Sequence, residues 1–215
     1  PLLSLARSDP DWRVRVNALK SLGGLDSSSS GKILTIIIMA TNEENEHVSL
    51  AGLSAMAQLG QKKSTDTMQL QFALRRVLVN ESGRYSSRHQ REAAIAYASV
   101  FGQSAYSVLT QQVDNGMLLK NSYVEALGFI ASENALRVLL EYARESDPHT
   151  QRLALEGVLN VVHSMKPGGA LLDAVGSSLI DGLSSNDRAV VTTAASALSD
   201  SLLADHSSIP HLTAA

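Results

Sequence analysis

A pattern of apolar residues returns six times along the 215 residues of this chain, and it constrains the fold more than any other feature. In the first copy, at 9–23, a turn with Asp and Pro precedes apolar residues spaced by four, one and three positions. Such spacing lines one face of an α-helix. The residues of that face are Val14, Ala18, Leu19 and Leu22. The other copies lie at 46–60, 89–102, 118–128, 147–159 and 187–198.

Another apolar helical stretch precedes each copy, so the repeating unit is a pair of helices. These first helices are expected at 1–8, 32–41, 68–79, 105–113, 135–144 and 171–183. Turn residues separate the helices of each pair, and their Asp or Asn side chains can cap the second helix. Equivalent positions recur about every 35 residues.

A two-helix unit of this size cannot bury its apolar faces alone, so successive units must stack. We therefore predict an all-α fold, an α-solenoid of about six helical hairpins stacked in a right-handed superhelix, as a single domain over 1–215. The predicted repeats cover about 1–24, 28–60, 65–102, 103–132, 133–165 and 168–204. Residues 205–215 are expected to begin a further repeat or form a tail, and the chain, which begins with Pro1, is expected to be part of a longer protein.

The repeated pattern resembles the second helix of the HEAT-repeat family. The matching residues of the first copy are Asp9, Val14, Arg15, Ala18, Leu19, Leu22 and Gly23. The chain departs from the family's pattern in lacking most first-helix prolines and at Gly52, Gln90, Tyr123 and Thr150. The resemblance implies that Asp9 and Arg15 support stacking between repeats. The segment 9–18 is also similar to HEAT segments of bacterial multidomain proteins, including some joined to a cyclophilin-type prolyl isomerase.

Composition limits the partners that the chain can bind and the kinds of catalytic or metal site that it can form. The net charge of −3 creates no overall field that would attract nucleic acid or an anionic membrane. The strongly apolar run 33–40 is far shorter than a membrane-spanning helix requires. The chain has no cysteine, which excludes a thiol nucleophile or zinc ribbon within it and favours a cytoplasmic location. We therefore expect no nucleic acid and no membrane as partner.

The motifs of common catalytic and metal sites are missing from the sequence. Neither a phosphate-binding loop nor a nucleophile elbow is complete, and no zinc-protease helix motif occurs. Three histidines, His47, His89 and His149, occupy the same position in their repeats. Neighbouring helices lie about 8 to 10 Å apart, so these imidazoles cannot share one metal ion. We predict no catalytic residue, no cofactor and no metal.

The third repeat concentrates positive charge on Arg75, Arg76 and the segment 84–91. Arginine can bind a carboxylate through two hydrogen bonds, and the neighbouring Tyr85 can stack, so an anion or peptide site is one interpretation. A solvated face balanced by Glu81 and Glu92 is the other. Trp12, the only tryptophan, is expected to cover the core of the adjacent repeat rather than to bind a partner.

These features predict a non-enzymatic scaffold that binds a protein or peptide on its concave face. The predicted partner-binding residues are Arg84, Tyr85, Arg88 and Arg91 of the third repeat, and Asn17, Lys20, Asn121, Glu125, Arg152 and Glu156 on the inner face of the second helices. The alternatives are a HEAT-like enzyme acting on DNA bases, a lyase that holds a tetrapyrrole, and an accessory array of a prolyl isomerase. The first would need a basic channel, and the second would need a large apolar groove.

Overall fold

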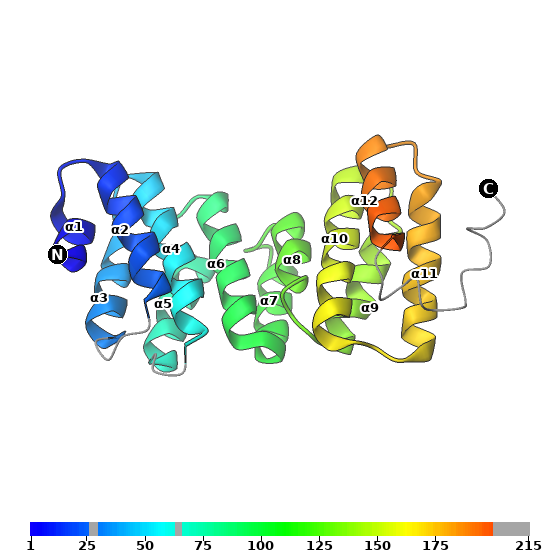
Figure 1. Ribbon diagram of the computed structural model, residues 1–215, viewed down its shortest axis with the longest axis horizontal. Helices are drawn as coiled ribbons and strands as arrows, with labels where there is room; N and C mark the ends of the chain where they lie inside the picture. Colours follow the sequence, from blue (N-terminus) through cyan, green and yellow to red (C-terminus); the bar gives the residue numbers. More distant parts are fainter. Residues whose placement is uncertain (26–29, 63–65, 200–215) are drawn as a thin grey trace. The chain divides into compact units, whose positions relative to one another are not determined.

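The computed structural model describes residues 1–25, 30–62 and 66–199, and every regular element in them is a helix (Figure 1). The first helices of the pairs are α1 (Leu2–Ser8), α3 (Ser30–Ala40), α5 (Thr67–Val79), α7 (Ala105–Asp114), α9 (Glu133–Tyr142) and α11 (Gly169–Leu183). The second helices are α2 (Trp12–Gly24), α4 (Glu46–Gly60), α6 (Ser87–Phe101), α8 (Lys120–Leu127), α10 (Pro148–Met165) and α12 (Arg188–Leu198). A short 3₁₀ helix, η1 (Gly102–Ser104), precedes α7. The all-α prediction, with about six helical pairs, is confirmed.

The chain divides into two compact units, Pro1–Ser122 (unit 1) and Tyr123–Ala215 (unit 2). In unit 1, α2, α4 and α6 lie side by side, and each packs against the first helix of its own pair. In unit 2, α10 lies beside α12, while α9 packs on α10 and α11 packs on α12. The single domain predicted over 1–215 stays a prediction. The predicted tail 205–215 and the end of the sixth repeat lie outside the described residues.

Turn residues start the second helices as the sequence predicts. The side chains of Asp11, Asn45, Asp147 and Asp187 accept hydrogen bonds from backbone N–H groups in the first turns of α2, α4, α10 and α12. These bonds satisfy donors that have no partner within the helix. The hydrogen bonds that Asp147 accepts from the side chain and backbone of Thr150 lower the pKa of its carboxyl group. The turns between the paired helices therefore help to fix where the second helices begin.

Leucines of the repeated pattern form the core. Leu22, Leu59, Leu127 and Leu155 are each at most 1% exposed. The glycine that follows Leu22 or Leu127 lets neighbouring second helices approach closely. A Cβ atom on Gly23 would lie 2.9 Å from the Cα of Ala55 in α4, and one on Gly128 would lie 2.9 Å from the Cα of Gly157 in α10. The glycine at the end of the repeated pattern is thus a requirement of helix packing.

Candidate functional site

The turn after α5 is held closed by its own side chains. Asn80 adopts a left-handed backbone conformation with φ 49° and ends α5. Its side-chain amide donates to the carbonyl oxygen of Tyr85 at 2.7 Å, and its Oδ1 accepts from the backbone N–H of Tyr85 at 2.9 Å. The phenol ring is consequently drawn inward, and Tyr85 is only 7% exposed. The expectation of an exposed Tyr85 that stacks on a partner is wrong, because this side chain is part of the packing between hairpins.

Asn42, in the turn between α3 and α4, collects donors from the third hairpin. Its Oδ1 accepts from the hydroxyl of Tyr85 at 3.1 Å and from Nη2 of Arg76 at 2.9 Å. Its backbone carbonyl accepts from Nη2 of Arg84. Two of the arginines predicted to form a charged site therefore connect the third hairpin to the second. In the sequence, Asn42 has the appearance of an ordinary turn residue.

His89 and His47 also connect neighbouring hairpins. The Nε2 atom of His89 lies 2.7 Å from the hydroxyl of Ser49 in α4, and its Nδ1 lies 2.8 Å from the hydroxyl of Ser86. Burial lowers the pKa of His89, the carboxylate of Glu46 opposes this shift, and Arg88 adds to it.

His47 stacks on Trp12 of the first hairpin, with ring centroids 4.6 Å apart and an interplanar angle of 19°. This contact joins Trp12 to the adjacent repeat, but His47 is exposed, so the expected covering of that repeat's core by Trp12 stays a prediction. In unit 2, Nδ1 of His149 lies 3.5 Å from Nη2 of Arg152. Among the described residues, no group of three or more His, Asp or Glu side chains is placed to hold a metal ion.

The other arginines of the third repeat differ in their pairing. Arg91 forms an ion pair with Glu92 at 2.8 Å. Arg75 and Arg88 are exposed, and neither guanidinium group has a hydrogen bond or ion pair within the described part of the chain. Arg75 and Arg88 are therefore the cations of this repeat that are available to a partner.

The outward side of α5 exposes two large apolar side chains. Met68 is 78% exposed and Phe72 is 74% exposed. They lie one helical turn apart, on the same side of a helix whose other side is buried. Phe72 also lines a cleft of about 480 Å³, together with Arg75, Arg76, Val79, Glu81 and Ser82. We call Met68, Phe72, Arg75 and Val79 the α5 face. This face is not among the surfaces predicted from the sequence.

A signal for the α5 face was present in the sequence. The buried residues of α5 are Leu70, Ala73, Leu74, Val77 and Leu78. They already complete one apolar stripe of a helix, so Met68 and Phe72 must fall on the opposite side.

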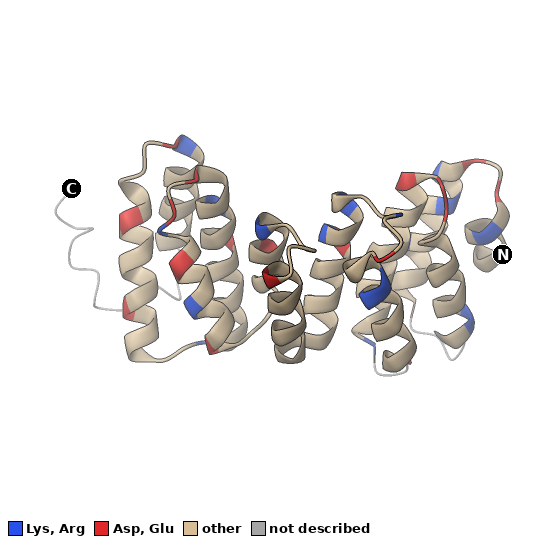
Figure 2. Cartoon of the chain, turned by 180° about the vertical axis from the view of Figure 1, so that it is seen from behind, with Lys and Arg blue, Asp and Glu red and all other residues tan. Residues whose placement is uncertain are grey.

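The predicted inner-face residues are divided between the two units. Asn17 and Lys20 are exposed on α2, and Asn121 is half-buried on α8. In unit 2, Glu125 is half-buried on α8, and Arg152 and Glu156 form an ion pair at 2.5 Å one turn apart on α10. Lys, Arg, Asp and Glu are interspersed along the helices of each unit (Figure 2). The role of these residues in binding stays a prediction.

The HEAT-repeat family model matches residues 1–28, which include the hairpin of α1 and α2. The first hairpin is therefore a HEAT repeat. A comparison with the sequences of curated proteins gives no match for this chain. The described part of the chain contains no helix that is both long and apolar enough to cross a membrane.

Several solved structures are similar to this chain. The designed armadillo repeat protein YIII(Dq)4CqI is 17% identical, with a TM-score of 0.47 over 94% of this chain and 98% of the other. A second designed armadillo repeat protein, in complex with the peptide (KR)4, is 17% identical, with a TM-score of 0.47 over 92% of this chain and 96% of the other. Human deoxyhypusine hydroxylase in complex with glycerol is 14% identical, with a TM-score of 0.43 over 94% of this chain and 83% of the other.

Proposed function

We propose that this protein is a non-enzymatic scaffold that binds a protein or peptide partner, and that the α5 face of unit 1 is a docking surface. The observation that carries the proposal is the exposure of Met68 and Phe72, at 78% and 74%, on adjacent turns of one helix. Aromatic residues, methionine and arginine are enriched at protein interfaces. An exposed cluster of apolar side chains beside an arginine therefore favours a protein partner.

The folding of the third hairpin does not require the α5 face. The opposite side of α5 supplies the buried residues, among them Leu70, Leu74 and Leu78, and α5 packs through that side against α6. The stability of the folded chain therefore does not depend on burial of Met68 and Phe72. A partner that covers them gains the hydrophobic free energy of their burial. The partner that fits this surface offers apolar contacts to Phe72 and a carboxylate to Arg75.

The inner face of the second helices is the alternative docking surface. In unit 1, Asn17 and Lys20 of α2 are exposed and accessible to a peptide. Both surfaces serve the same function, and substitutions that change one leave the other intact.

Selection of binding peptides from a random library displayed on phage, with the immobilised full chain as bait, tests the proposal. We expect peptides that bind the unaltered chain to lose at least tenfold in affinity for Phe72→Ser. The matched control is Leu119→Ser, which removes another exposed apolar side chain of unit 1, 60% exposed, and should leave affinity unchanged. Circular dichroism checks that both variants remain folded.

If the peptides bind the Phe72→Ser variant normally but no longer bind the Lys20→Glu variant, the binding site lies on the inner face. A selection that yields no specific peptide would refute the binding role.

A further inference from the structure

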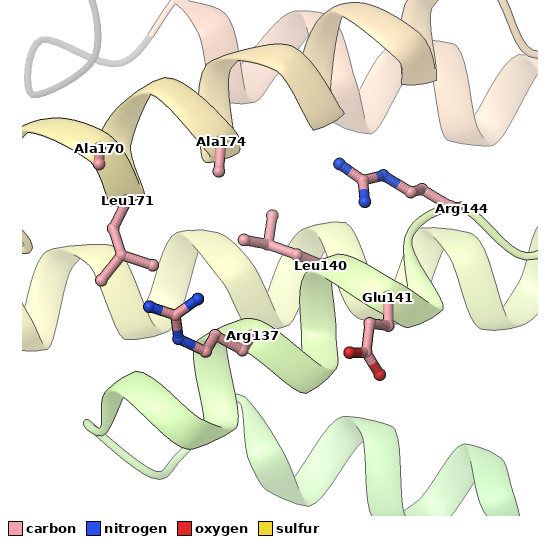
Figure 3. Close-up of a pocket in the computed structure, with 7 residues that line it drawn as sticks. All are labelled: Arg137, Leu140, Glu141, Arg144, Ala170, Leu171 and Ala174. Carbon is pink, nitrogen blue, oxygen red and sulfur yellow. The ribbon is translucent and has the colours of Figure 1, made fainter.

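A cleft of about 290 Å³ lies in unit 2 between α9 and α11 (Figure 3). Its apolar wall consists of Leu140 on α9 and Leu171 on α11, beside the small side chains of Ala170 and Ala174. Helix α9 packs mainly on α10, and α11 mainly on α12, so the two first helices leave space between them. Ligand pockets commonly measure about 300 to 1,000 Å³. This cleft therefore suits an inserted side chain better than a large cofactor.

Two arginines lie on either side of the apolar wall. Figure 3 shows Leu140 between Arg137 and Arg144. The two arginines are seven residues apart, about two helical turns or roughly 10 Å along the axis of α9 and the turn that follows it. The carboxylate of Glu141, also at the cleft, points away from α11 (Figure 3). The opening toward a partner therefore has positive charge at both ends.

The pairing of these arginines leaves them available to a carboxylate. Arg144 is exposed, and its guanidinium group has no hydrogen bond or ion pair among the residues that the structure describes. Arg137 donates from Nη2 to Oε1 of Glu133 at 2.5 Å, but both side chains are more than half exposed, at 62% and 56%. An exposed ion pair within one helix contributes little free energy and can exchange its partner. A guanidinium group has five N–H donors, so Arg137 can also donate to a second carboxylate.

We propose that this cleft binds an acidic peptide segment that inserts an apolar side chain between Leu140 and Leu171 and pairs one carboxylate with Arg137 and another with Arg144. A helical peptide with two glutamates seven residues apart matches the spacing of the arginines. A leucine three or four residues after the first glutamate lies on the same face of that helix, opposite the apolar wall. The site lies in unit 2 and does not depend on the α5 face.

Fluorescence anisotropy with a labelled helical peptide of this design, titrated with the full chain, tests the site. We expect saturable binding that weakens at least fivefold when the glutamates of the peptide are changed to glutamine or its leucine to serine. On the protein, Arg144→Gln should weaken binding at least fivefold by removing a charge. Ala174→Leu should do so by filling the cleft. The matched control is Arg188→Gln, which removes an exposed arginine of α12, also in unit 2, and should leave affinity unchanged.

The site is refuted if the peptide does not bind, if Ala174→Leu binds with full affinity, or if Arg188→Gln weakens binding as much as Arg144→Gln. Equal binding of a single-stranded oligonucleotide of similar charge would show a general affinity for anions and would also overturn the proposal. The peptide should bind Phe72→Ser as it binds the unaltered chain. A failure at this cleft is thereby distinguished from a failure of the α5 face.

Discussion

The hydroxyl of Tyr85 donates a hydrogen bond at 3.1 Å to Oδ1 of Asn42, which lies 43 residues earlier in the preceding hairpin. The same oxygen accepts from Arg76, so one side-chain amide joins the first helix and the turn of the third hairpin to the turn of the second. Neighbouring units of a repeat array depend on such contacts, because each unit is stable only with its neighbours. The long turn of the third repeat therefore serves stacking.

Removal of the Tyr85 hydroxyl should weaken this connection. We expect Tyr85→Phe to lower the free energy of unfolding by about 0.5 to 1.5 kcal/mol, the usual contribution of one hydrogen bond. Tyr106→Phe is the matched control, because Tyr106 is half-buried in unit 1 and its hydroxyl has no hydrogen bond within the described residues. Urea unfolding followed by circular dichroism measures both. Equal effects of the two changes would contradict the role assigned to Tyr85.

The two adjacent glycines at the end of α2 should respond oppositely to alanine. A Cβ atom on Gly23 would meet the backbone of Ala55 at 2.9 Å, whereas one on Gly24 would meet nothing within 4 Å. We expect Gly23→Ala to destabilise by about 1 to 3 kcal/mol through overpacking. Gly24→Ala should leave stability unchanged or raise it by up to about 1 kcal/mol, since alanine favours the helix. Thermal unfolding compares the pair, and a stabilising Gly23→Ala would show that α2 and α4 are not so close.

The sequence predicts the helices and the leucine core well because both depend on a local period. Residues such as Leu22 and Leu155 recur at one place in the pattern, and burial follows the helical repeat directly. The partners of Asn42 could not be predicted in this way, because they come from another hairpin and depend on the path of the turn that holds Tyr85. The exposure of Phe72 could have been predicted from the sequence, since the buried stripe of α5 is complete without it.

The core leucines should be costly to truncate. Leu59 is 1% exposed, so Leu59→Ala should leave a cavity and lower the free energy of unfolding by about 2 to 5 kcal/mol. Leu119→Ala, at a leucine that is 60% exposed, should change it by no more than about 0.5 kcal/mol. Urea unfolding of the two variants under one set of conditions gives the comparison. A loss below about 0.5 kcal/mol for Leu59→Ala would mean that the buried face of α4 is assigned wrongly.

The imidazole of His89 should make stability depend on pH. The hydroxyl of Ser49 donates to the carbonyl of Glu46 at 3.1 Å, so it accepts from Nε2 of His89, and the ring carries its proton there. Nδ1 then accepts from the hydroxyl of Ser86 at 2.8 Å, the nearer of two acceptors for that hydroxyl, since Oε1 of Glu46 lies at 3.5 Å. A second proton on Nδ1 would remove this acceptor and place a charge where burial already lowers the pKa of His89.

Because the pKa of His89 is lower in the folded chain than its ordinary value of 6.5, the unfolded chain binds more protons between these two values. The contribution of His89 to the free energy of unfolding is therefore complete above pH 6.5 and declines as the pH falls toward the lowered pKa. Between pH 7.5 and 5.5, His89→Gln should lose less stability than the unaltered chain, as measured by urea unfolding at each pH. Nuclear magnetic resonance titration of the imidazole gives the direct measurement, and a midpoint at or above pH 6.5 would contradict the packing described for Ser49 and Ser86.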